Sequence, residues 1–136
     1  MKRIISLSSC ALLASAVLLA QMPMASAELM TSVPSGGLTV SDWYKQDVYD
    51  RSSTKIGKIE DVLVSSSGQV SAVIVAVGGF LGAGEKDVAV DFTSVKRTMK
   101  DNKAYLTIDT TKDALKSAPG FKYDSDKTRW VPVSTK

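Results

Sequence analysis

Hydrophobic and polar residues alternate along several short segments of the chain, and a period of two predicts β-strands. The clearest segment is Gln69–Val77, which reads QVSAVIVAV. Its side chains would divide between two apolar faces, one with Val73, Val75 and Val77 and the other with Ala72, Ile74 and Ala76. Apolar residues on both faces predict a central strand that is covered twice. We favour cover by a helix or the terminus of the same chain over cover by a partner chain, because monomers rarely expose such faces.

Other segments show a similar pattern and are bounded by turn residues. We expect strands at Asp47–Asp50, Lys55–Val64, Lys86–Phe92 and Ala104–Ile108. The second of these also fits helical spacing, but its β-branched residues and the turn at Ser65–Gly68 favour a strand. In the third, Val88, Val90 and Phe92 would point inward. Short strands with close turns predict a small all-β barrel of about six strands.

A few short helical segments interrupt this pattern. We expect them at Trp43–Gln46, Thr93–Met99 and Lys112–Ser117. The last has Thr111 as its N-cap and is followed by Pro119 and Gly120, which end helices. Trp43 is expected to cover one end of the core, because a large ring adds much buried area in a small domain.

Residues 1–27 show the three regions of a secretory signal peptide. Lys2–Arg3 is the positive start, Ile4–Ala20 is an almost uncharged apolar run, and Ala25–Ala27 offers a small-residue cleavage site. A retained membrane anchor is the alternative, but the apolar run is short for a membrane span. We therefore expect removal of this segment, export to the periplasm or secretion beyond it, and no stable membrane span afterwards.

Few side chains of the sequence suit catalysis or metal binding. The chain has no histidine, and its one cysteine, Cys10, lies at the start of the apolar run, where we interpret it as an ordinary signal-peptide residue rather than a lipid attachment point. Histidine-dependent catalytic triads and histidine-ligated zinc are thereby excluded. Glu60 and Asp61 would point to opposite faces of a strand, and Asp124–Thr128 lacks the glycine and glutamate of a calcium loop. We expect no enzyme, no metal and no cofactor.

The charge of the chain is nearly balanced once the signal segment is removed. From residue 28 onward there are 15 lysines and arginines against 14 aspartates and glutamates, a net charge of +1. A dedicated nucleic-acid-binding domain would carry a one-signed basic patch. We therefore expect no nucleic-acid partner.

The order of motifs along the chain resembles the PRC-barrel family. The similar segments are VYD at 48–50, KIGKIED at 55–61, GQV at 68–70, AVIV at 72–75, GGFLG at 78–82 and GEKDVAV at 84–90. The family includes the cytoplasmic domain of the reaction centre H subunit and a domain of a ribosome-maturation factor, and this chain looks more like exported single-domain members. The resemblance covers about residues 41–123, which leaves 28–40 as a flexible leader and 124–136 as a polar tail. It implies a module that recruits other macromolecules and has no shared catalytic residues.

The glycine-rich loop is the candidate interaction site. Its residues are Gly78, Gly79, Phe80, Leu81, Gly82, Gly84, Glu85, Lys86 and Asp87. Glycines permit sharp bends around the apolar tip Phe80–Leu81, and the charged residues could form a polar rim around an apolar contact. A solvated loop edge is the alternative interpretation. Phosphate binding is not expected, because a glutamate follows the last glycine where a phosphate loop has lysine.

These observations favour a non-enzymatic protein-interaction or scaffold module of the bacterial cell envelope. We expect docking through residues 78–87 and the adjoining strand edge, with an envelope protein or a second copy as partner. Two alternatives stay open. One is a self-associating, stress-related envelope protein that uses Gln69–Val77, and the other is a small-ligand-binding barrel, although bulky inward residues are expected to fill a barrel of this size.

Overall fold

The computed structural model describes residues 26–78 and 84–134 and divides the chain into two units, Met1–Ser35 and Gly36–Lys136. In the first unit, the described residues contain no helix or strand, and Leu29, Met30 and Val33 are exposed. The second unit contains the helices and strands. Among the described residues, no helix is both long and apolar enough to cross a membrane.

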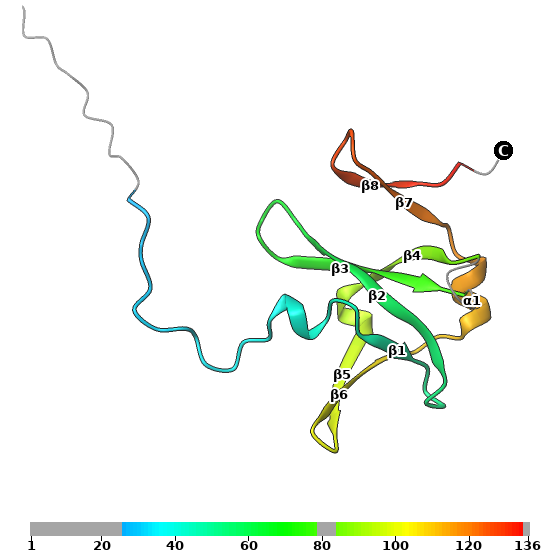
Figure 1. Ribbon diagram of the computed structural model, residues 1–136, viewed down its shortest axis with the longest axis horizontal. Coiled ribbons are helices and arrows are strands. Elements are labelled where there is room, and N and C mark those ends of the chain that lie inside the picture. The colour runs from blue at the N-terminus through cyan, green and yellow to red at the C-terminus, as the bar shows by residue number, and fades with distance from the viewer. Residues whose placement is uncertain (1–25, 79–83, 135–136) are drawn as a thin grey trace, which may run out of the picture. The chain divides into compact units, whose positions relative to one another are not determined.

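The second unit is an eight-stranded sheet with one short α-helix (Figure 1). The elements in chain order are η1 (Val40–Asp42), β1 (Asp47–Tyr49), β2 (Lys55–Val64), β3 (Val70–Val77), β4 (Lys86–Asp91), η2 (Phe92–Ser94), β5 (Val95–Lys100), β6 (Lys103–Ile108), α1 (Lys112–Ser117), β7 (Phe121–Asp124) and β8 (Arg129–Pro132). The strand order is β5-β6-β1-β2-β3-β4-β7-β8. Neighbours are antiparallel except β1 and β6, which are parallel. The predicted all-β class is confirmed, with more strands than expected.

One hydrophobic core lies on the inner face of this sheet. Its fully buried members include Val48, Ile59, Val73, Val75, Val77 and Leu106. The valine face predicted for β3 is therefore confirmed. Trp43 is 6% exposed, and its ring centroid lies 4.6 Å from that of Phe92. The tryptophan is thus a core residue that packs against an aromatic neighbour, as its size predicts.

The outer face of β3 is covered as well. Ile74 is only 1% exposed, and it lies opposite Asp61 in the β2–β3 register. Side chains of directly opposite residues share a face of the sheet, and Asp61 accepts a hydrogen bond from Trp130 of β8. The C-terminal strand of the same chain therefore lies near Ile74 on this face, which agrees with cover by the chain terminus.

The expected helix at Thr93–Met99 is wrong. Only the short 3₁₀ turn η2 forms there, and the chain continues as β5 in full register with β6. Val95 lies opposite Ile108, and both are buried in the core. Burial of this pair in a sheet ladder outweighs the weak local helix signal, because propensity yields to tertiary packing.

Two further local differences concern the ends of the domain. The helical turn expected at Trp43–Gln46 lies earlier, at η1, where Asp42 Oδ2 accepts a hydrogen bond from the backbone N–H of Thr39 at 3.1 Å. The segment expected to be a polar tail, 124–136, contains β8, which pairs with β7 as a hairpin. The hairpin forms because Trp130 and Tyr123 pack together across it, with ring centroids 5.8 Å apart.

Candidate functional site

The candidate loop is framed by two glycines in the left-handed backbone region. Gly78 has φ of +92° and Gly84 has φ of +75°, a conformation that glycine adopts without steric cost. A Cβ atom on Gly78 would lie 3.3 Å from the carbonyl oxygen of Gly84, so the two ends of the loop approach closely. The predicted tip residues Gly79, Phe80, Leu81 and Gly82 lie outside the described residues.

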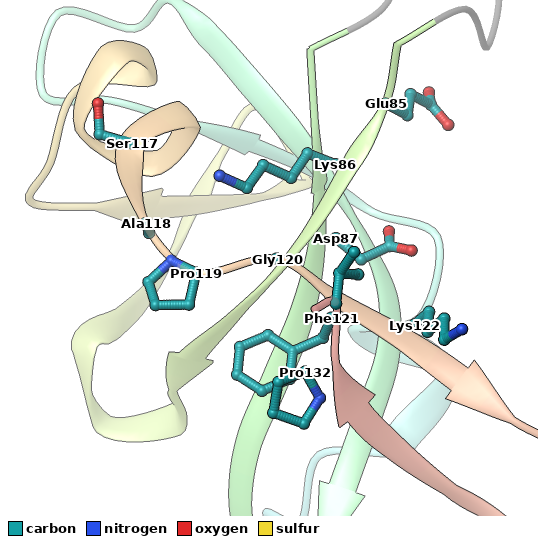
Figure 2. Close-up of a pocket in the computed structure, with 11 residues that line it drawn as sticks. Glu85, Lys86, Asp87, Ser117, Ala118, Pro119, Gly120, Phe121, Lys122 and Pro132 are labelled. Carbon is teal, nitrogen blue, oxygen red and sulfur yellow. The ribbon is translucent and has the colours of Figure 1, made fainter. Parts of the chain in front are cut away.

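The charged residues at the end of the loop point to opposite sides of the chain where β4 begins. Lys86 extends toward the end of α1, whereas Glu85 and Asp87 lie on the other side of the strand (Figure 2). Lys86 Nζ donates a hydrogen bond of 2.6 Å to the carbonyl oxygen of Lys116. The last carbonyls of a helix have no partner within it. Lys86 therefore connects the C-terminal turn of α1 to β4, and it lies on the other side of the strand from Glu85 and Asp87.

A cavity of about 750 Å³ adjoins this end of the loop. It is lined by Glu85, Lys86, Asp87, Ser117, Ala118, Pro119, Gly120, Phe121, Lys122, Pro132 and Val133. Phe121 and Pro132 lie together at its base, below Gly120 in the view of Figure 2. The structure thus brings the predicted loop residues together with the segment after α1 and with the β7–β8 hairpin. The sequence interpretation missed this second half of the site because no local pattern signals it.

The Asp87 carboxylate lies within the electrostatic influence of two other carboxylates, those of Glu60 and Glu85. Partial burial raises the pKa of Asp87 above its ordinary value, and the nearby charges of Glu60 and Glu85 raise it further. Lys45 opposes this effect, but it is already paired with the Glu60 carboxylate. The surface beside the cavity therefore favours a positively charged group from outside.

The edge of β4 next to the cavity is mostly unpaired. β4 joins β7 through a single residue pair, Asp87 with Phe121, whereas it pairs with β3 along its whole length. A second cavity of about 580 Å³ runs beside Val88–Asp91 and is also lined by Leu115 of α1 and Ile108 of β6. An unpaired strand edge presents backbone donors and acceptors that can pair with another extended chain.

A family model for the PRC-barrel domain matches residues 36–115, which is more than half of the chain. The chain belongs to the PRC-barrel family. A search of curated proteins gives no match. The matched residues include the whole loop Gly78–Asp87 and end within α1, before β7.

This PRC-barrel protein therefore builds its cavity from two sources. Glu85, Lys86 and Asp87 belong to the part that matches the family, whereas Phe121 and Pro132 come from residues beyond it. Within residues 26–78 and 84–134, no cluster of three or more histidine, cysteine, aspartate or glutamate side chains could hold a metal ion. What the site offers is apolar surface, carboxylates and a strand edge, which suits noncovalent binding.

Proposed function

We propose that this PRC-barrel protein is a non-enzymatic protein-interaction module of the bacterial cell envelope. It docks through the loop Gly78–Asp87 and the adjoining edge of β4. The observation that supports this most is the cavity of about 750 Å³, where the end of the loop meets the apolar residues of the β7–β8 hairpin. Loops on a rigid scaffold commonly carry binding residues.

The chemistry of the site indicates the kind of partner segment that fits. An extended segment can pair with the edge of β4 and place an apolar side chain against Phe121 and Pro132. A lysine or arginine in the same segment would neutralise the carboxylates Glu85 and Asp87. The partner is therefore an envelope protein with a short, extended, apolar and basic segment.

The envelope location rests on the pattern of residues 1–27, which combines a positive start, an apolar run and a small-residue cleavage site. The absence of histidine from the sequence supports a non-enzymatic role, because it removes the most common general acid and base. Noncovalent docking requires neither.

The two alternative functions receive less support. Self-association through β3 would need a free edge or face, but β3 lies between β2 and β4 and buries Ile74 on its outer side. A ligand inside the barrel would need space that Ile59, Val75 and Leu106 already fill.

The test is capture of the partner from living cells, using the tagged full chain and chemical crosslinking followed by mass spectrometry. The loop variant carries Phe80→Ser and Leu81→Ser. Its matched control carries Val64→Ser and Met99→Ser, at two side chains outside the loop that are each 58% exposed. We expect one discrete envelope protein on the wild type and the control, and its loss from the loop variant. Unchanged capture by a folded loop variant would place the docking site elsewhere, and recovery of the protein itself alone would establish self-association instead.

A further inference from the structure

A second surface of the domain lies on the outer faces of β1, β5, β6 and the first half of β2. Val48, Val95, Leu106 and Ile108 point into the core from β1, β5 and β6, so the alternate residues of these strands point outward. On β2, Lys58 and Lys55 share this outer face because they lie opposite Asp47 and Tyr49 in the register with β1. The outward residues are Asp47, Tyr49, Lys55, Lys58, Lys96, Thr98, Lys100, Lys103, Tyr105 and Thr107. We call this set the lysine face.

The lysine face carries a local excess of positive charge, which the nearly balanced total charge of the chain does not reveal. It carries five lysines and one carboxylate, Asp47, which is paired with Lys55 at 2.7 Å. Within the second unit, residues 36–78 and 84–134 hold 14 basic and 13 acidic residues in total, which leaves nine basic against twelve acidic residues outside the lysine face. Positive charge is therefore distributed unevenly over the domain. A surface that carries mainly one sign of charge raises the local concentration of oppositely charged ligands.

Part of this face is hollowed into a groove of about 480 Å³, lined by Lys45, Gln46, Asp47, Tyr49, Lys58, Lys103, Ala104 and Tyr105. The rings of Tyr49 and Tyr105 form its aromatic part, with centroids 5.6 Å apart and an angle of 51° between their planes. Both tyrosines are half-buried, and a buried tyrosine body with an accessible hydroxyl suits a binding surface.

The lysines of the groove differ in their availability. Lys45 is paired with Glu60, whereas no salt bridge involves Lys58 or Lys103 among the parts of the chain that the structure describes. Among the other carboxylates near the face, Asp109 pairs with Arg51, and Asp101 lies in the turn at the tip of the β5–β6 hairpin. Asp50 lines a small pocket together with Lys96. Two lysines at the groove are therefore available for an anionic ligand.

We propose that this groove binds an acidic polysaccharide, a chain of carboxylated sugars. Lys58 and Lys103 would pair with the carboxylates, since an ammonium group forms strong hydrogen bonds with them. Sugar hydroxyls both donate and accept hydrogen bonds, and Gln46, Asp47 and the tyrosine hydroxyls supply both kinds of partner. The groove is polar and contains mixed donors and acceptors, which fits a carbohydrate.

Two observations favour a glycan over single-stranded nucleic acid, which also binds basic aromatic surfaces. Binding of successive bases uses open aromatic faces as stacking platforms, but Tyr49 and Tyr105 pack against each other and so cover part of their faces. Asp47 also lies in the groove, where its carboxylate can accept hydrogen bonds from the many hydroxyls of a sugar chain, whereas a phosphodiester backbone offers it few or no donors. This glycan site shares no residue with the loop Gly78–Asp87 and does not depend on the proposed docking function.

The test is isothermal titration calorimetry of the full chain with oligogalacturonate, a carboxylated sugar chain, and with dextran as the neutral polysaccharide. We expect saturable binding of oligogalacturonate that weakens with added salt and no binding of dextran. The groove variant Lys58→Gln with Lys103→Gln should bind about tenfold more weakly or worse, and a control with Lys112→Gln and Lys116→Gln should lie within about twofold of the wild type. Both variants remove two exposed lysines, and circular dichroism checks that each is folded.

Three results would overturn the proposal. Equal weakening in the groove variant and the control would mean diffuse attraction without a site. If dextran bound as tightly as oligogalacturonate, the charge of the ligand would not contribute to binding. Tighter binding of single-stranded DNA than of oligogalacturonate, with the same dependence on Lys58 and Lys103, would assign the groove to nucleic acid instead.

Discussion

Trp130 Nε1 donates a hydrogen bond of 2.7 Å to Asp61 Oδ2 and so links β8 to β2 across 69 positions of sequence. The other carboxylate oxygen of Asp61 accepts from the backbone N–H of Val62 at 2.8 Å. Because β7 joins the sheet through one residue pair only, this side-chain bond is a main restraint on the hairpin that forms one wall of the candidate site.

Replacing the indole donor should loosen this hairpin. In Trp130→Phe, the partly buried Asp61 carboxylate loses a hydrogen-bond partner, which lowers the free energy of unfolding by about 1–3 kcal/mol. Urea unfolding measures the loss, and hydrogen exchange of the β7 and β8 amides shows where it acts. Tyr123→Phe is the control, since its side chain is 54% exposed. Equal effects of the two substitutions would mean that the bond to Asp61 is not a restraint.

Gly57 allows β2 and β3 to pack closely. A Cβ atom at Gly57 would lie 2.6 Å from the carbonyl oxygen of Ala76 and 2.7 Å from Val75 Cγ1. Gly57→Ala therefore forces backbone apart at the core and should cost about 1–3 kcal/mol or more in urea unfolding. At Gly120 a Cβ would meet only the side chains of Lys86 and Val133, so Gly120→Ala should cost much less. A well-tolerated Gly57→Ala would contradict the packing described.

Asp91 should make stability depend on acid. Hydrogen bonds from the Thr93 hydroxyl and backbone N–H hold the pKa of Asp91 below its usual value. A lowered pKa adds stability that is present above the ordinary aspartate pKa and is lost as pH falls through the lowered value. Wild type should thus be more stable than Asp91→Asn at neutral pH, and the difference should shrink in strong acid. Urea unfolding over a pH series measures it, and a difference independent of pH would refute the assignment.

Asp87 should behave in the opposite sense. Its pKa is raised by burial and by Glu60 and Glu85, so the folded state holds the proton more tightly than the unfolded state. Stability is then lost as pH rises through the ordinary and raised pKa values. Asp87→Asn should be more stable than wild type at neutral pH and no more stable in strong acid. If Asp87→Asn were less stable than wild type at neutral pH, burial and the neighbouring carboxylates would not disfavour the charged form of Asp87.

The strands of the central sheet were predictable because their patterns are local. Lys55–Val64 has the same bounds in the sequence interpretation and in β2, and the turn at Ser65–Gly68 marks its end clearly. The valine face of β3 also follows from alternation alone. By contrast, β5 has Arg97 on its inward side, opposite the buried Leu106, and this polar residue hides the alternation.

The candidate site was predictable only in part. Glycines and alternating charges indicate a loop and the strand that follows it, because both features lie within ten residues. The cavity depends on contacts such as Asp87 with Phe121 and Asp61 with Trp130, which join residues far apart in the chain. The periodicity of the sequence contains no sign of such contacts. For this reason, the polar segment 124–136 was interpreted as a tail. The lysine face could not be predicted for a related reason. The total charge of a sequence does not show which charged residues lie on the same face of the fold.

The most direct test of the docking site is site-specific photocrosslinking in living cells. A photoreactive amino acid replaces Lys122, which lines the cavity, or Lys112, an exposed residue of α1 that does not line it. The account predicts a discrete crosslinked envelope protein from position 122, its absence from position 112, and its loss when Phe80→Ser and Leu81→Ser are added. Identical products from both positions, or none from position 122, would contradict docking at this cavity.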